Sequence, residues 1–116
     1  MQKKSNKELC LSYLKRYAAK DIDSIELMFA DDIALRDWKI RVTGKERALE
    51  ETRKNFEAAK SIGIEVLSTF ESENTVAAEL KITVDASEEL YVVDVIEINP
   101  KGKIHSIRAY LGRGDH

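Results

Sequence analysis

Hydrophobic residues near the start of the chain recur at helical spacing. Leu9, Tyr13 and Tyr17 lie four residues apart, so they share one face of an amphipathic helix. Ser5 and Glu8 precede this stripe at the spacing of a capping box, in which each side chain accepts a hydrogen bond from the other residue's backbone N–H. The pattern predicts a helix of about 14 residues that starts after Ser5.

Two further helices are predicted in the first half of the chain. Asp21 is a candidate N-cap for a short helix, which Asp31 and Asp32 are expected to end ahead of a short strand at 33–37. The segment 43–46, Thr-Gly-Lys-Glu, has the form of a second capping box and is expected to open a helix that runs to about residue 60. The apolar stripe of this helix contains Ala48, Leu49, Thr52, Phe56 and Ala59.

The second half of the chain has the character of β-strands. The predicted strands are 61–71, 75–85, 89–98 and 103–112, with short turns between them. Connections this short join antiparallel neighbours. The order of elements therefore predicts a single α+β domain over residues 1–116, in which three N-terminal helices pack in the concave face of a curved antiparallel sheet.

The two middle strands differ in how their polar residues are distributed. Strand 75–85 is apolar on one side only, whereas strand 89–98 is apolar on both, with Val93 and Val95 on the side opposite Val92 and Ile96. A strand that is apolar on both sides needs cover on both. The helices cover one side, and a second copy of the chain is the simplest cover for the other. The pattern predicts a homodimer through the outer face of the sheet.

Composition excludes several classes of protein. The 116 residues carry a net charge of −2, and the one basic cluster, at Lys3, Lys4 and Lys7, is typical of a solvated tail, so we expect no nucleic-acid partner. No apolar run is long enough for a membrane span, and no apolar signal region follows the first residues. The expected location is a reducing cytoplasm.

Few residues could bind a metal ion or form a disulfide. Cys10 is the single cysteine, which excludes an intramolecular disulfide and a cysteine-based zinc site, and it is most simply a small core residue. The two histidines are His105, expected at the rim of the last strand, and His116 at the end of the chain. We therefore expect no histidine-based metal site, whereas a site made of Asp and Glu alone stays open.

Three polar side chains are candidates for a functional site. Asp94 and Tyr13 lie on apolar faces, and Asp37 lies next to Trp38. Asp94 shares a strand face with Val92 and Ile96, so its carboxyl group is either at an exposed edge or buried, and a buried carboxyl must be paired or protonated. Tyr13 lies in the helical stripe and is either a core tyrosine bonded to a carbonyl or part of a site. Asp37, beside Trp38, is by itself an ordinary loop carboxylate.

These residues occur within a wider pattern. The matching segments are 28–32 (Met-Phe-Ala-Asp-Asp), 43–46 (Thr-Gly-Lys-Glu), 94–96 (Asp-Val-Ile), 102–104 (Gly-Lys-Ile) and 109–110 (Ala-Tyr). Together they resemble the ketosteroid isomerase branch of the nuclear transport factor 2-like, or SnoaL-like, superfamily. The resemblance covers nearly the whole chain and implies a cone-shaped, cystatin-like fold.

The resemblance also implies a reaction and roles for three residues. Without gaps from the flanking motifs, Asp37 falls on the family's catalytic base, Tyr13 on its oxyanion-hole tyrosine and Asp94 on its protonated oxyanion-hole aspartic acid. The implied activity is that of a cofactor-independent steroid delta-isomerase, which moves a double bond next to a ketone through a dienolate. The resemblance therefore implies no metal and no cofactor. The substrate would be steroid-like or another polycyclic apolar molecule.

The chain departs from the family pattern at several positions. Trp38 replaces the common proline after the base, Phe29 and Thr52 replace supporting tyrosines, and Leu111 replaces an aromatic residue. The expected substrate pocket consists of Phe29, Trp38, Thr52, Phe56, Val66, Leu80, Val92, Ile96, Ile107, Ala109 and Leu111. Two alternatives stay open: a non-catalytic ligand-binding or dimerisation module of the same fold, and a SnoaL-like cyclase or dehydratase.

Overall fold

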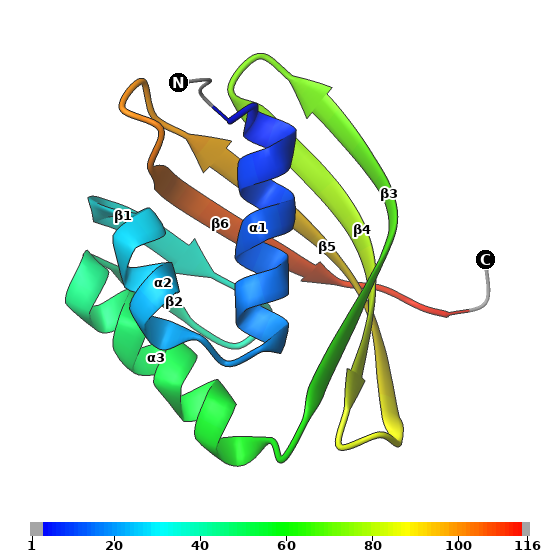
Figure 1. The fold of residues 1–116 in the computed structure, drawn as a ribbon. Helices are drawn as coiled ribbons and strands as arrows, with labels where there is room; N and C mark the ends of the chain where they lie inside the picture. Colours follow the sequence, from blue (N-terminus) through cyan, green and yellow to red (C-terminus); the bar gives the residue numbers. More distant parts are fainter. Residues whose placement is uncertain (1–3, 115–116) are drawn as a thin grey trace.

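The computed structural model describes residues 4–114 and has the predicted α+β architecture; Lys3 and His116 lie outside the described residues. The helices are α1 (Asn6–Ala18), α2 (Ile22–Met28) and α3 (Lys45–Ala58). The strands are β1 (Phe29–Arg36), β2 (Arg41–Thr43), β3 (Ile62–Ser72), β4 (Thr75–Val84), β5 (Glu88–Ile98) and β6 (Ile104–Leu111). All six strands form one curved sheet in the order β2-β1-β6-β5-β4-β3, and the helices lie on one side of it (Figure 1).

The sheet is mixed, whereas a purely antiparallel sheet was predicted. The hairpins from β3 to β6 are antiparallel as expected, but β1 pairs with β6 in parallel, with Leu35 opposite Ile107. Loop length could not predict this pairing, because α3 and four strands separate β1 from β6 along the chain. A direct short connection is what forces neighbouring strands to be antiparallel.

The first two helices begin where the sequence predicts. The Ser5 hydroxyl accepts from the Glu8 backbone N–H at 3.1 Å, and the Glu8 carboxylate accepts from the Ser5 N–H at 3.1 Å. Asp21 caps α2 by accepting from the Ser24 N–H at 3.2 Å. The predicted end of α2 at Asp31 and Asp32 is wrong, because β1 already starts at Phe29, a side chain that is only 1% exposed.

The predicted capping box before α3 is also wrong. Thr43 is the last residue of β2 and pairs with Ala34, so its backbone belongs to the sheet. Gly44 is the N-cap instead and makes no side-chain hydrogen bond to the helix. At the other end, α3 stops at Ala58, and the Lys20 ammonium group donates to the carbonyl oxygens of Ala59 and Lys60.

The two faces of the sheet have different surroundings. On the inner face of β4, Val76, Ala78 and Leu80 are fully buried beneath the helices, which confirms the predicted alternation. No helix of the described residues covers the outer face, where Phe70 is 66% and Tyr110 is 44% exposed. Within residues 4–114, no helix is long and apolar enough to cross a membrane.

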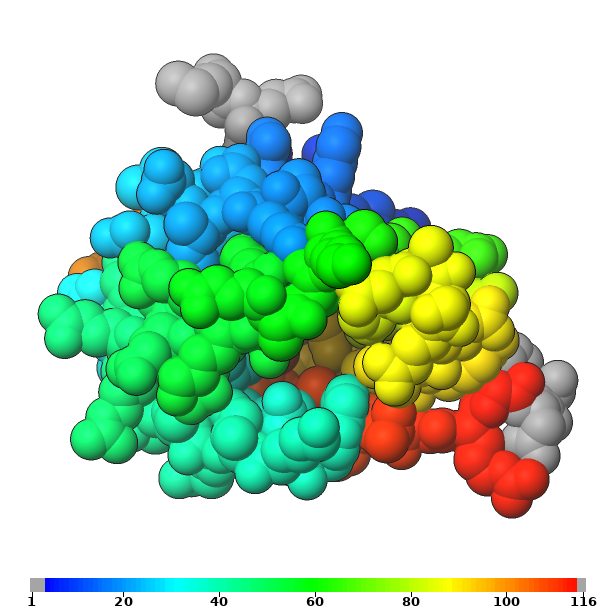
Figure 2. All heavy atoms as spheres, turned by 90° about the horizontal axis from the view of Figure 1, so that it is seen from below, coloured from blue at the N-terminus to red at the C-terminus, as the bar shows by residue number. Residues whose placement is uncertain are grey.

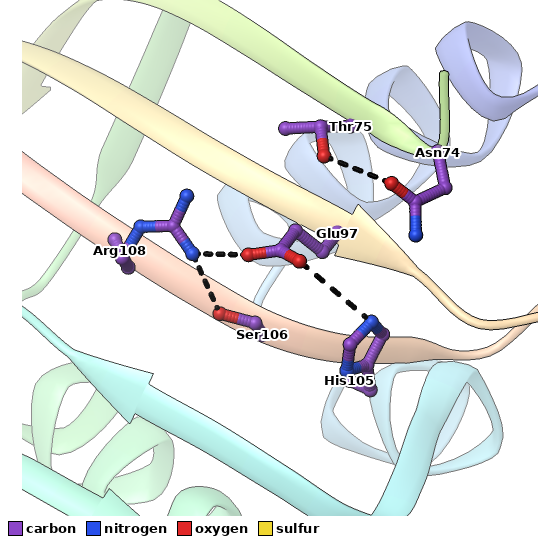
Figure 3. A network of polar contacts seen from close by, with 6 residues as sticks. All are labelled: Asn74, Thr75, Glu97, His105, Ser106 and Arg108. Carbon is purple, nitrogen blue, oxygen red and sulfur yellow. Dashed lines mark hydrogen bonds and ion pairs between the residues drawn. The ribbon is translucent and has the colours of Figure 1, made fainter. Parts of the chain in front are cut away.

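A small polar network lies on this outer face (Figure 3). The Arg108 guanidinium donates to the Glu97 carboxylate and, at 3.2 Å, to the Ser106 hydroxyl. The His105 ring nitrogen Nε2 is 4.0 Å from the other Glu97 oxygen. The network joins β5 to β6 at the rim of the strand pair, where His105 was expected. Farther along the outer face of β5 lie the apolar residues Val93 and Val95.

We expect the backbone of Gly44 to make this residue hard to replace. Its φ of +96° with ψ of 144° lies in a region that side chains avoid, although a Cβ would meet no atom within 4 Å. Gly44→Ala should lower the free energy of unfolding by about 1–3 kcal/mol in urea denaturation. Gly63→Ala is the matched control, because Gly63 lies in β3 and its Cβ would only touch Thr83 at 3.9 Å. Equal losses in both variants would contradict this assignment.

Candidate active site

Asp94 occupies the middle of the inner face of β5. Its neighbours along the strand face are Val92 and Ile96, which are 3% and 0% exposed. Across the sheet it pairs with Ala78 on β4 and Ala109 on β6. Because both partners end at a methyl group, they leave space beside the carboxyl group that larger side chains would fill.

Tyr13 approaches this position from the helix side. It is 4% exposed, and its ring packs against Tyr17 and Phe29 with centroid distances of 6.0 Å to each. In the described part of the chain, neither its hydroxyl nor the Asp94 carboxyl makes a hydrogen bond, yet no fully enclosed side-chain polar atom lacks a partner. Both groups must therefore border space that water can enter.

Asp37 follows directly after β1 and faces the same side of the sheet. Leu35 pairs with the buried Ile107, and strand alternation puts Asp37 on that inner face two residues later, level with Ala109. One strand then lies between Asp37 and Asp94, so their backbones are about 10 Å apart. The Asp37 oxygen Oδ1 accepts from the backbone N–H groups of Lys39 at 2.7 Å and Ile40 at 2.9 Å.

The environment favours the neutral form of Asp94. Burial, and then the nearby charge of Asp37, raise its pKa from 3.8 to about 7. Burial is also the main cause that raises the pKa of Tyr13, with smaller contributions from Tyr17 and Asp94. Near neutral pH the site thus offers two hydrogen-bond donors, the Tyr13 phenol and a substantially protonated Asp94, together with the carboxylate of Asp37.

The predicted pocket residues divide into a buried and an exposed group. The buried ones are Phe29, Thr52, Phe56, Leu80, Val92, Ile96 and Ile107, and Ala109 is half-buried. Trp38, Val66 and Leu111 are 43%, 36% and 47% exposed. The Thr52 hydroxyl donates to the Ala48 carbonyl at 2.8 Å, so it is engaged within α3.

The molecule is hollowed where the helices and the sheet diverge. Figure 2 shows an opening between the end of α3, the turn from β4 to β5 and the residues after β1, with β5 and β6 visible in its depth. Asp37 belongs to the segment on one side of this opening. Among the described residues, no three His, Cys, Asp or Glu side chains come together as a metal site.

Comparison with known proteins supports the family assignment. The family model of the SnoaL-like domain matches residues 11–107. The chain belongs to the SnoaL-like domain family. No curated protein matches this SnoaL-like chain in sequence.

Solved structures of the same fold carry several different descriptions. An NTF2-like protein of unknown function from Cytophaga hutchinsonii is 17% identical, with 97% of this chain and 95% of that chain covered and a TM-score of 0.80. A proposed ketosteroid isomerase from Kribbella flavida is 15% identical, with 96% and 80% covered and a TM-score of 0.81. The epoxide hydrolase/cyclase-like enzyme SalBIII, which has a role in pyran ring formation in the polyether salinomycin, is 24% identical, with 92% and 90% covered and a TM-score of 0.80. At these identities the likeness shows the fold alone.

Two polar residues of this SnoaL-like domain were missed by the sequence analysis. The Asn55 side-chain nitrogen donates to the Tyr17 hydroxyl oxygen at 3.0 Å. Burial raises the pKa of Tyr17, the Asn55 hydrogen bond opposes this, and Asp94 and Asp37 raise it further. The four-residue spacing from Tyr13 could have indicated Tyr17, but Asn55 could not be predicted, because its side chain on α3 meets Tyr17 on α1 only in the folded structure.

The raised pKa of Asp94 predicts a pH-dependent cost to stability. Since the pKa in the folded state is above that of the unfolded chain, the stabilising proton is fully bound below about pH 4 and is lost as the pH rises through about 7. Asp94→Asn cannot ionise, so its stability advantage over the wild type should grow by about 3 kcal/mol between about pH 5 and about pH 8. Urea denaturation at both pH values measures this difference. The exposed Asp32→Asn is the control, and an Asp94→Asn advantage that does not change with pH would refute the prediction.

Proposed function

We propose that this SnoaL-like domain is a cofactor-independent isomerase that moves a carbon–carbon double bond into conjugation with a ketone. The observation that carries the proposal is the pairing of one largely neutral carboxyl group, Asp94, with one carboxylate, Asp37, across an apolar cone. Tyr13 supplies a second donor beside Asp94. The apolar walls favour a steroid-like or other polycyclic substrate.

The proposed reaction has two proton-transfer steps, both carried out by Asp37. Asp37 removes a proton from the carbon between the carbonyl and the double bond, and the electron pair moves onto the carbonyl oxygen to give a dienolate. Tyr13 and protonated Asp94 donate hydrogen bonds to this oxygen as its negative charge develops. Asp37 then returns the proton to the far carbon of the conjugated system, which restores the carbonyl.

The positions of the groups suit this sequence of steps. Only Oδ1 of Asp37 accepts hydrogen bonds from the described residues, so Oδ2 is available to carry the proton. A separation of about 10 Å between the two aspartate backbones leaves room for a ring between their side chains. Asp94 can donate only while it is protonated, so the same burial that raises its pKa makes it a donor near neutral pH.

Replacement of the proposed base should abolish most of the activity. With a β,γ-unsaturated ketosteroid as substrate, Asp37→Asn should lower kcat by about 10²–10⁴-fold, because a positioned base contributes this much. The absorbance of the conjugated product measures the rate. The wild-type rate should also fall as the pH rises through about 7, where Asp94 loses its proton.

The control variant and the wild-type measurement separate the alternatives. Asp32 is exposed on β1, away from the inner face, so Asp32→Asn should retain the wild-type rate. Equal rates in Asp37→Asn and the wild type would remove Asp37 from the reaction. No conversion by the wild type would favour the ligand-binding module or another reaction, such as that of a cyclase or dehydratase.

We also propose that a second copy of the chain covers the outer face of the sheet. Val93 and Val95 lie there on β5 beside the exposed Tyr110, whose ring carries the Arg36 guanidinium at 4.5 Å. Val93, Val95 and Tyr110 form an apolar strip beside the Arg108–Glu97 pair. This strip can meet the identical strip of a second copy across a two-fold axis. A homodimer would remove this strip from water.

Sedimentation equilibrium tests this assembly. The wild type should have twice the mass of one chain, and Val93→Glu should shift it to the monomer mass, because each two-fold interface would receive two buried carboxylates. Arg53→Glu is the control that introduces a glutamate on the exposed side of α3, away from the sheet, and it should leave the dimer intact. A wild-type protein with monomer mass would contradict the proposed homodimer.

A further inference from the structure

Tyr17 and Asn55 form a second polar position at the rim of the cone, about one helical turn from Tyr13, where Tyr17 is half-buried and Asn55 is exposed. Tyr17 is held between α1 and α3 by two edge-on ring contacts, with its ring centre 6.0 Å from that of Tyr13 and 4.9 Å from that of Phe56. The hydrogen bond from Asn55, at 3.0 Å, also fixes its hydroxyl oxygen. Neither side chain is free to turn away without loss of these contacts.

The direction of this hydrogen bond leaves two unused polar groups. Asn55 is the donor, so the phenol proton of Tyr17 is left for another acceptor, and no described residue accepts it. The Asn55 amide oxygen is likewise without a donor among the described residues. The pair thus presents one donor and one acceptor side by side, which is the complement of a hydroxyl group.

The Tyr17 ring lies beside Tyr13 and Phe56, which belong to the proposed site and its pocket. Asp94 on β5 and Asp37 after β1 both act electrostatically on the Tyr17 hydroxyl, and these residues lie on different parts of the cone wall. Tyr13, by contrast, is influenced by Asp94 and not resolvably by Asp37. Tyr17 is the more exposed of the two tyrosines, since Tyr13 is 4% exposed whereas Tyr17 is half-buried and bonded to the exposed Asn55.

We infer that Tyr17 and Asn55 bind a second oxygen of the substrate, and that the natural substrate is an oxygenated polycyclic ketone with a hydroxyl group at this position. The inference rests on the proposed function only for the location of the ketone oxygen at Tyr13 and Asp94. A purely hydrocarbon body that covered Tyr17 would displace water from its hydroxyl and leave this donor without an acceptor, which is costly. Sites built around such a donor reject ligands that lack the matching oxygen.

The test compares two ligands that differ by one hydroxyl group. The probes are 2-naphthol, whose single oxygen can bind at Tyr13 and Asp94, and the set of dihydroxynaphthalenes that retain this oxygen. Isothermal titration calorimetry should show that the best dihydroxynaphthalene binds the wild type about 10-fold more tightly than 2-naphthol does, since one added hydrogen bond contributes about that factor. In Tyr17→Phe, the advantage should disappear while the affinity for 2-naphthol stays within about 2-fold.

A folding check, a second test variant and a control variant accompany this experiment. Tyr17→Phe retains the ring contacts, and circular dichroism verifies that it folds. Asn55→Ala should reduce the dihydroxynaphthalene advantage in the same way, whereas Arg53→Ala, on the exposed side of α3, should not. The inference is overturned if no dihydroxynaphthalene binds more tightly than 2-naphthol, or if Tyr17→Phe weakens both ligands equally or neither.

A separate variant tests the proposed function. Asp94→Leu, which removes the donor and keeps a side chain of similar size, should weaken both ligands if their common oxygen binds at Asp94. An unchanged affinity for 2-naphthol in Asp94→Leu would count against the oxyanion site and the isomerase proposal. The difference between ligands in Tyr17→Phe would still report on the second oxygen position.

Discussion

The burial of a carboxyl group in the apolar inner face of β5 is the constraint on which the rest of this site depends. Asp94 lies between Val92 and Ile96, and the alanines opposite it on β4 and β6 offer no hydrogen bond. Water is the natural partner of a carboxylate, and its removal disfavours the charged form. The domain therefore carries a carboxyl group that is neutral over much of the acidic and neutral range, at a cost in stability at higher pH.

The carboxyl group that lowers stability at higher pH lies in the proposed active site, where it can act as a hydrogen-bond donor. The charge of Asp37, one strand away, adds to the effect of burial in raising the pKa of Asp94. A pair of carboxyl groups in different states is a general arrangement for acid and base work at neutral pH. Ketone isomerisation is the use proposed here, and the apolar wall would bind the body of the substrate.

The secondary structure shows how local and distant interactions share control of the fold. The Ser5–Glu8 cap, the Asp21 cap and the alternation along β4 depend on residues close in sequence, and the pattern alone predicted them correctly. The wrong predictions, the capping box at Thr43 and the purely antiparallel sheet, both failed because of pairing between strands. Thr43 fits a helix cap by its sequence, but its pairing with Ala34 draws it into the sheet.

Sequence patterns were enough to predict the fold class, the SnoaL-like superfamily and the three residues that stand out chemically, Tyr13, Asp37 and Asp94. Periodicity and capping are local properties, and an unexpected polar residue is visible wherever the apolar pattern is regular. Only the tertiary structure decided the parallel pairing of β1 with β6, the hollow between the helices and the sheet, and the Asn55–Tyr17 hydrogen bond. Each of these joins segments far apart in the chain, so it depends on how whole elements pack and not on the order of neighbouring residues.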